Sequence, residues 1–170
     1  MPADSANQPE IGQVCDYQDE IMQRQLIING NPMEKVAGFS RAVRVGPFIS
    51  VGSTSPVDRQ GNTVGVGDPA TQARQCLEII AAALQAAGSG LEDIVRTRFM
   101  LTDINAWPQV MAIRKEYLGH AAPVDTIVEV QRFLNPEWLI EVEADAVVAH
   151  EEIINGDVAS ADQQRRFGER

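Results

Sequence analysis

The chain has 170 residues, of which 44% are hydrophobic, and its formal net charge is −10 at pH 7. This length suits a single domain with a substantial core, and an acidic chain without a lysine or arginine cluster is a poor ligand for nucleic acid. No apolar run approaches the roughly 20 residues that span a bilayer, so no membrane partner is expected. Cys15 and Cys76 are too far apart for a metal motif, and a reducing, cytoplasmic setting is the simplest interpretation.

The two ends of the chain are polar and lack any apolar period. Residues 1–25 and 151–170 are rich in acidic, amide and hydroxyl side chains, which favours a flexible N-terminal arm and a C-terminal tail. We therefore expect one folded domain over residues 26–150.

The first half of this domain predicts a strand pair followed by a helix. Residues 41–45 and 48–53 are β-prone segments around a Gly46-Pro47 turn, which is typical of a hairpin. Asp68 suits a helix N-cap and Gly88 the residue that ends a helix, so we expect a helix over residues 69–87. Apolar residues at helical spacing predict one buried stripe, formed by Ala73, Leu77, Ile80, Leu84 and Ala87.

The second half predicts three strands and one more helix. Residues 94–102 alternate, with one face formed by Val95, Thr97, Phe99 and Leu101 and the other by Arg96, Arg98 and Met100. A helix over residues 105–118 and two closing strands, 126–132 and 139–149, complete the domain. The order β-β-α-β-α-β-β, with one further strand possible near residues 26–29, predicts the α+β class, with two helices packed on one face of a sheet.

The last predicted strand indicates what the sheet face without helices carries. Its alternation places Ile140, Val142 and Ala144 toward the helices and Glu141 and Glu143 on the opposite face. Such a charged face is either solvated, which is common for antiparallel sheets, or forms a polar interface between subunits. The pattern alone leaves both interpretations open.

Several strings, in this order and spacing, resemble the Rid family, also called the YjgF or RidA family. They include GFSRAV at residues 38–43, VGPFISVG at 45–52, LEDIVRT at 91–97 and the segment 123–130. The resemblance covers residues 31–149 and implies a chorismate-mutase-like fold, with one mostly antiparallel sheet, that assembles into a barrel-like homotrimer. It also implies a small-metabolite cleft at each subunit boundary, where enamines or imines are hydrolysed with release of ammonia and without a metal or organic cofactor.

The chain departs from the family pattern at the positions that hold the ligand. The substrate-binding arginine of the P-x-R-[ST] string falls on Asp125, and this change of sign predicts poor binding of a substrate carboxylate. Glu141 corresponds to the glutamate that positions the attacking water, and it is the candidate catalytic residue. The resemblance assigns five further substrate-binding positions: Phe39 in place of a tyrosine, Val51 in place of a serine, Gly52, Met111 in place of an asparagine, and Ile127 in place of a cysteine.

Three residues have a second interpretation. Glu141 is either an acid/base or a member of an ionic interface layer, and Asp125 either faces the ligand or caps the start of a strand. Arg98 either binds substrate in place of the lost guanidinium or bridges to Glu141 or Glu143. If Asp125 and Glu141 share the cleft, we expect one of them to have a raised pKa, and the cleft to prefer neutral or cationic nitrogen compounds.

Three functions are compatible with the sequence. We favour a homotrimer that hydrolyses an enamine, an imine or a related C–N bond in a substrate other than a simple amino-acid imine. The alternative is a non-catalytic, small-molecule-binding or regulatory trimer that kept the fold and lost the chemistry. Ribonuclease activity, a label often attached to this family, is disfavoured because the chain is acidic and has no basic groove.

Overall fold

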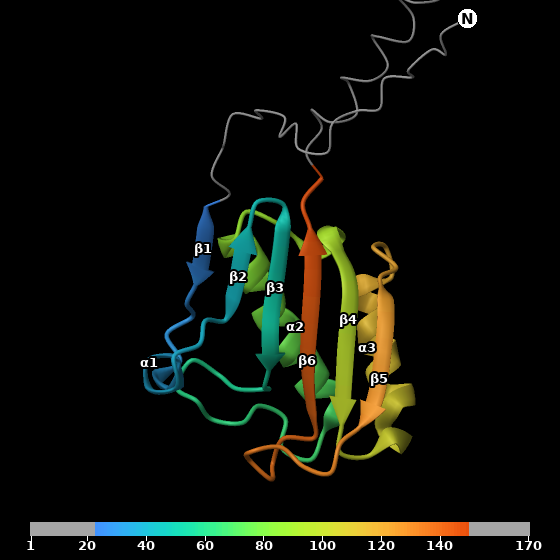
Figure 1. The fold of residues 1–170 in the computed structure, drawn as a ribbon. Helices are drawn as coiled ribbons and strands as arrows, with labels where there is room; N and C mark the ends of the chain where they lie inside the picture. The colour runs from blue at the N-terminus through green and yellow to red at the C-terminus, as the bar shows by residue number, and fades with distance from the viewer. Residues whose placement is uncertain (1–22, 150–170) are drawn as a thin grey trace, which may run out of the picture.

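Six strands form a single sheet in the computed structural model, which describes residues 23–149 (Figure 1). The strand order is β1-β2-β3-β6-β4-β5, and every neighbouring pair is antiparallel except β4 and β5, which run parallel. The strands are β1 (Arg24–Ile27), β2 (Ala42–Val45), β3 (Phe48–Thr54), β4 (Ile94–Leu101), β5 (Val124–Glu129) and β6 (Ile140–Val147). The helices are α1 (Pro32–Ala37), α2 (Pro69–Ala86) and α3 (Trp107–Leu118), with short 3-10 helices η1 at Leu91–Asp93 and η2 at Ile104–Ala106.

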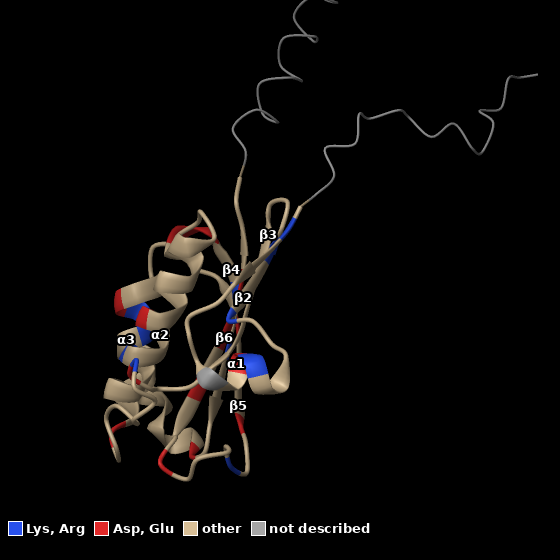
Figure 2. Ribbon diagram, turned by 90° about the vertical axis from the view of Figure 1, so that its left-hand side faces the viewer, with Lys and Arg blue, Asp and Glu red and all other residues tan. Residues whose placement is uncertain are grey.

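The two longer helices, α2 and α3, cover one face of the sheet and leave the other face open, which confirms the predicted α+β class (Figure 2). Helix α2 begins as its sequence predicts, because the Asp68 carboxylate accepts hydrogen bonds from the backbone N–H groups of Ala70 and Thr71. Gly88 follows the helix with a φ of +74°, a left-handed conformation that suits glycine. No helix of the described part of the chain is long and apolar enough to cross a membrane.

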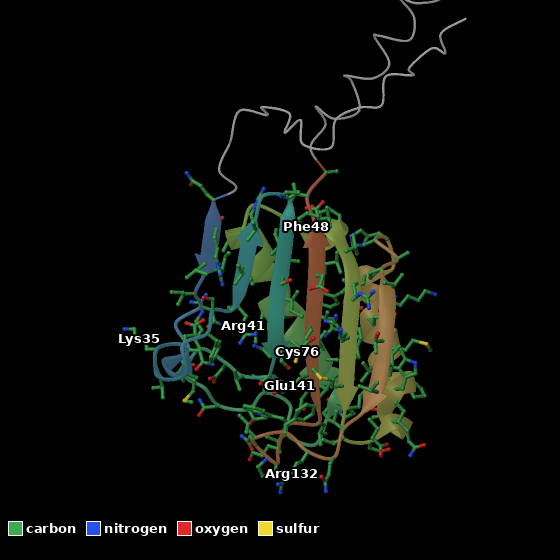
Figure 3. The ribbon with its side chains drawn as sticks, viewed as in Figure 1. Lys35, Arg41, Phe48, Cys76, Arg132 and Glu141 are labelled. Carbon is green, nitrogen blue, oxygen red and sulfur yellow. The ribbon has the colours of Figure 1, made fainter. Side chains whose placement is uncertain are left out.

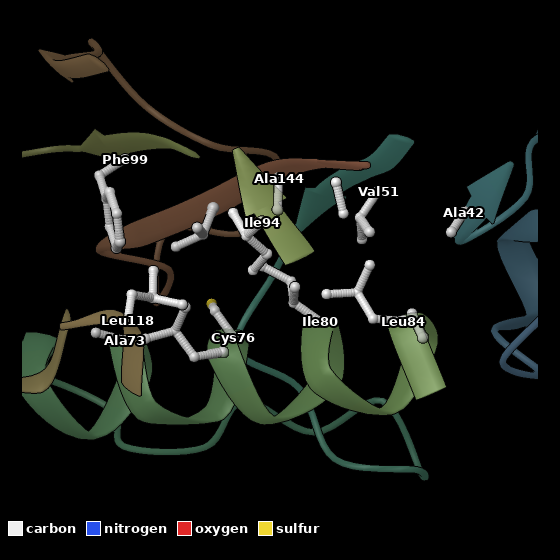
Figure 4. Packing of buried hydrophobic residues seen from close by; sticks show 14 of the residues in the cluster. Ala42, Val51, Ala73, Cys76, Ile80, Leu84, Ile94, Phe99, Leu118 and Ala144 are labelled. Atoms are coloured by element: carbon white, nitrogen blue, oxygen red, sulfur yellow. The ribbon is translucent and has the colours of Figure 1, made fainter. Parts of the chain in front are cut away.

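The core lies between α2 and the covered face of the sheet (Figure 4). Leu77, Ile80 and Leu84 of α2 are fully buried, and they face a sheet whose alternate residues are equally buried. Each such side chain stabilises the fold by about 1.5–3 kcal/mol through removal of apolar surface from water. Under α3, the rings of Phe99 and Trp107 meet edge to face with their centroids 5.6 Å apart.

The ends of the domain differ from the expected boundaries. Strand β1 begins at Arg24, inside the segment predicted to be a flexible arm, and pairs with β2 from Arg24↔Val45 to Ile27↔Ala42. Three of its four residues are exposed because it is an edge strand, so no apolar period marks it in the sequence. Residues 1–22 and the predicted tail 151–170 lie outside the described residues.

Strand β4 departs from strict alternation at its start. Ile94 is 2% exposed whereas Val95, predicted to face the core, is 46% exposed. The pairing of β4 with β6 shifts register between Ile94 and Arg96, so the irregularity turns Val95 outward. From Thr97 onward, the predicted inward residues are buried.

Candidate functional site

Glu141 lies on the open face of the sheet, near the end where β3 and β6 diverge (Figure 3). Its neighbours in β6, Ile140 and Val142, are fully buried on the covered face, whereas Glu141 is half-buried. Ser53 donates a hydrogen bond from Oγ to Glu141 Oε2, and Ser55 donates from Oγ to Oε1 at 2.6 Å. The carboxylate is therefore held through both oxygens by neutral hydroxyl groups.

The two serines reach Glu141 because β3 is irregular. The β3–β6 pairing runs regularly from Phe48 to Val51, shifts register, and resumes only at Thr54 opposite Val142. Gly52 and Ser53 lie inside that break, and Ser55 follows the strand end. A bulge of this kind redirects side chains at the edge of a functional site.

Arg41, which was not among the residues predicted for the site, binds the backbone of the β3 bulge through its guanidinium. Its Nη1 donates to the carbonyl oxygens of Gly52 at 3.0 Å and Ser53 at 2.8 Å, and to Thr54 Oγ1 at 2.9 Å. The residue is only 6% exposed. Burial lowers the pKa of the Arg41 guanidinium, while the carboxylates of Glu34 and Glu141 act in the opposite direction and favour its charged form.

Cys76 lies in the core beneath this region and is fully buried (Figure 3). Burial raises the pKa of its thiol, and the negative charge of Glu141 adds to the effect. The thiol therefore stays protonated at neutral pH and is a packing residue rather than a nucleophile.

Asp125 lies on the opposite face of the sheet from Glu141. It pairs with the buried Thr97 of β4, whose hydroxyl donates a hydrogen bond to Asp125 Oδ1, and its Oδ2 is 2.6 Å from Nε of Arg114 in α3. The expectation that Asp125 and Glu141 form a coupled acidic pair is thus wrong within one chain. The expected preference for neutral or cationic nitrogen compounds, which depended on this pair, therefore has no support within one chain.

Arg98 lies on the open face, where it is bound by neighbours on β6. Its Nη1 is 2.9 Å from Glu143 Oε2 and its Nη2 is 3.7 Å from Asp145 Oδ2. The bridge to Glu143 is one of the two alternatives that the sequence left open. No lysine or arginine nitrogen of residues 23–149 lies within 4.0 Å of the Glu141 carboxylate, so Glu141 differs from the next two acids of its strand.

The other predicted substrate-binding residues are dispersed in the chain. Val51 is a core residue, 3% exposed, and Ile127 packs against the core from β5. Phe39 and Met111 are 39% and 49% exposed, on the segment after α1 and on α3 respectively. Gly52 alone lies beside the Glu141 site, where its N–H donates to the Arg41 carbonyl oxygen at 3.0 Å.

Ser53, Ser55 and Arg41 are the site residues that sequence reasoning missed. Ser53 lies within β3 and Ser55 directly after it, and the break in the β3 pairing turns both toward β6. The sequence holds no comparable signal for Arg41, which directly precedes β2 and is buried through its contacts with the β3 bulge. Among residues 23–149, no group of three or more His, Cys, Asp or Glu side chains could hold a metal ion.

Comparison with known proteins agrees with this architecture. The model of the family described as Endoribonuclease L-PSP matches residues 30–148. A RutC family protein of Pyrococcus horikoshii is 33% identical over 121 residues, which are 71% of this chain and 95% of the relative. The 3-aminoacrylate deaminase RutC of Acinetobacter baylyi is 30% identical over 129 residues, 76% of this chain and 99% of that protein.

Among solved structures, a YjgF/YER057c/UK114 family member from Mycobacterium tuberculosis is 39% identical with a TM-score of 0.68, covering 74% of this chain and all of that one. The fold and the sequence thus define one class, a small α+β protein with an open sheet face. The chain belongs to the Endoribonuclease L-PSP family, which is the Rid or YjgF family that its motifs indicate.

Proposed function

We propose that the protein is a homotrimeric Rid-type hydrolase that adds water to the carbon of an enamine, an imine or a related C–N group. The observation that carries this proposal is the environment of Glu141. Both of its oxygens are held by serine hydroxyls, and no lysine or arginine nitrogen of the described residues lies within 4.0 Å of it. A carboxylate oriented in this way is suited to accept a proton from a water molecule.

In the proposed reaction, the Glu141 carboxylate accepts a proton in the first step and returns it in the second. The substrate reacts as the protonated imine, a form that an enamine reaches by taking up a proton from solvent at its carbon. The oxygen of a water molecule bonds to the carbon of the protonated imine, the C=N π electron pair moves to the nitrogen, and Glu141 takes one proton of that water. The resulting carbinolamine then breaks its C–N bond, which releases ammonia and leaves a carbonyl product. Glu141 returns its proton in the second step, so no redox partner or metal is required.

The open sheet face supports a trimer built with that face inside. Cross-strand neighbours share a face, and on this face the ionic residues of β4 and β6 are flanked by exposed apolar side chains. Leu26 and Phe48 on one side are 53% and 63% exposed, and Val124 and Val128 on the other are 60% and 40% exposed. Exposed apolar residues on both sides of a polar stripe are typical of an interface between subunits.

The substrate differs from a simple amino-acid imine in this proposal. Asp125 stands where the family has its carboxylate-binding arginine, and its own charge is matched by Arg114. Arg98 is engaged by Glu143 and Asp145. A substrate carboxylate therefore finds Arg98 already engaged, and the exposed Arg96 is the arginine of β4 that has no carboxylate within 4.0 Å among the described residues.

The loss of that arginine also favours the second candidate, a trimer that binds a small metabolite without turnover. A ribonuclease role has less support, because the net charge of −10 and the mixed charges of the open face suit a phosphate backbone poorly.

An ammonia-release assay on a panel of imines and enamines tests the proposal, with 2-aminoacrylate as the amino-acid member. We expect Glu141→Gln to reduce kcat about a hundredfold, in the range of general acid–base effects, and turnover to be poor with 2-aminoacrylate. Glu143→Gln is the matched control, since Glu143 shares the strand and the face but is bound by Arg98. Equal rates for the two variants, or a monomeric mass by light scattering, would contradict the proposal.

A further inference from the structure

Arg41 is the buried charge that the proposed chemistry does not yet use. It is 6% exposed, and within residues 23–149 no carboxylate oxygen lies within 4.0 Å of it. Its Nε is buried and has no hydrogen-bond partner among the described residues. Burial of a guanidinium is costly unless it is paired, so an ion pair does not explain why an arginine occupies this position.

The contacts of Arg41 converge on one short stretch of backbone. Its Nη1 binds the carbonyl oxygens on both sides of the Ser53 Cα, those of Gly52 and of Ser53 itself, and also Thr54 Oγ1. A second anchor comes from the Gly52 N–H, which donates to the Arg41 carbonyl oxygen. These contacts fix the peptide groups that set the direction of the Ser53 side chain.

The same stretch is where β3 leaves its pairing with β6. The ladder hydrogen bonds that would hold a regular strand are interrupted between Val51 and Thr54. Backbone groups that lose ladder partners need others when they are buried. Arg41 supplies these partners, and the irregular stretch turns Ser53 and Ser55 toward Glu141.

We propose that Arg41 is a positioning residue for Glu141, acting through the β3 bulge that aims the Ser53 and Ser55 hydroxyls at the carboxylate. This inference rests on the proposed function of Glu141. The carboxylates of Glu34 and then Glu141 oppose the effect of burial on the pKa of the Arg41 guanidinium and favour its charged form. Loss of Arg41 releases the bulge and leaves Glu141 free to turn, which slows the chemical step without removing a substrate contact.

A double-mutant cycle tests the path from Arg41 through the serines. The variants are Arg41→Met, the pair Ser53→Ala with Ser55→Ala, and all three changes together, each assayed for kcat and KM in ammonia release. We expect Arg41→Met and the serine pair each to reduce kcat at least tenfold, with KM within about twofold, since an interaction made in the transition state is lost. The kcat of the triple variant should be no more than about twofold lower than that of Arg41→Met or of the serine pair.

Arg44→Met is the matched control. Arg44 lies in β2, three residues after Arg41, and its guanidinium also donates hydrogen bonds to backbone carbonyls, those of Gly46 at 2.9 Å and Ala87 at 2.6 Å. These contacts join β2 to the end of α2 and do not touch the bulge. We expect kcat of Arg44→Met within about twofold of the original. Losses that multiply in the triple variant, or an equal loss in Arg44→Met, would overturn the proposal.

Crystal structures separate this inference from the proposed function. In Arg41→Met, or in Arg41→Lys if the methionine variant does not fold, we expect at least one of the serine contacts to Glu141 to be broken or lengthened beyond hydrogen-bond range. Intact contacts in both variants would refute the positioning role whatever the activity. If Glu141→Gln releases ammonia at the original rate, the hydrolase proposal fails, and the crystal structures still decide what Arg41 does.

Discussion

The carboxylates on the two faces of the sheet have different binding partners. On the helix-covered face, Asp125 has a side chain only 20% exposed, and it is matched by the Arg114 guanidinium and the Thr97 hydroxyl. On the open face, Arg98 binds the acids at positions 143 and 145, and Glu141 is left to neutral hydroxyls. The comparison separates an acid that stabilises packing from an acid that remains available to a ligand.

This difference follows from what each face must do. A charge between a sheet and a helix loses its hydration, so it needs a counter-charge and hydrogen bonds for the fold to be stable. A half-buried charge on an open face keeps part of its hydration, and incomplete pairing is tolerated there. A functional role for Glu141 therefore lowers the stability of the fold less than the same role would for an acid on the covered face.

The largest effect is expected on the open face, if it is the inner surface of the proposed trimer. Arg98→Met removes the guanidinium that lies 2.9 Å from Glu143 and 3.7 Å from Asp145, so the two acids repel each other more strongly in a subunit interface, where screening is weak. We expect loss of the trimer at micromolar concentration, measured by light scattering. Arg74→Met is the control, since Arg74 pairs with Glu116 on the helix layer and should leave the mass unchanged. An unchanged mass in Arg98→Met would show that the open face is solvated.

The covered face should respond through stability. Asp125→Ala leaves Arg114, whose side chain is 15% exposed, without its counter-charge. We expect the free energy of unfolding to fall by about 2–3 kcal/mol, as for other hydrogen-bonded charges that lose a partner. Urea unfolding at a fixed protein concentration measures this.

The rate of ammonia release per folded Asp125→Ala trimer provides the complementary measurement. We expect it to stay within about twofold of the original, because Asp125 faces α3 and not the Glu141 site. A variant that keeps its stability and loses activity would place Asp125 in the cleft after all.

Much of the fold could be predicted from local chemistry. Asp68, the apolar stripe and Gly88 defined α2 because capping and helical periodicity are properties of neighbouring residues. The alternation of β6 placed Glu141 on the face opposite the core for the same reason. Family membership followed from short strings in a fixed order, and the comparisons confirm it.

The face of the sheet on which Asp125 lies could also be predicted from local pattern. Asp125 and Ile127 are two residues apart in β5, so they share a face, and an apolar residue at 127 indicates the covered one. The family resemblance places a substrate-binding position at Asp125, whereas the strand period places its side chain on the covered face of its own chain. Ser53 and Ser55 were beyond local reasoning, since their direction depends on a register shift between strands distant in sequence.

The carboxylate of Asp68 lies in a third environment, the exposed N-terminal end of helix α2. Asp68 accepts hydrogen bonds from the Thr71 hydroxyl at 2.6 Å and from two backbone N–H groups, without any cation. Hydrogen bonds from Thr71, first from its side chain and then from its backbone, lower the pKa of the Asp68 carboxyl. We expect Asp68→Ala to reduce the free energy of unfolding by about 1 kcal/mol at pH 7, the usual effect of removing an N-cap.

The pH dependence of that loss has a defined sign. Because the folded-state pKa of Asp68 lies below its unfolded value of about 3.9, its ionised form stabilises the fold at every pH above that value. The contribution declines as the pH falls through the folded-state pKa, so the difference between the original protein and Asp68→Ala should narrow in acid. Asp68→Asn serves as the control, since an asparagine caps the helix without titrating. A difference that stays constant from pH 7 to about pH 2 would mean that the charge of Asp68 contributes nothing and that only its shape caps α2.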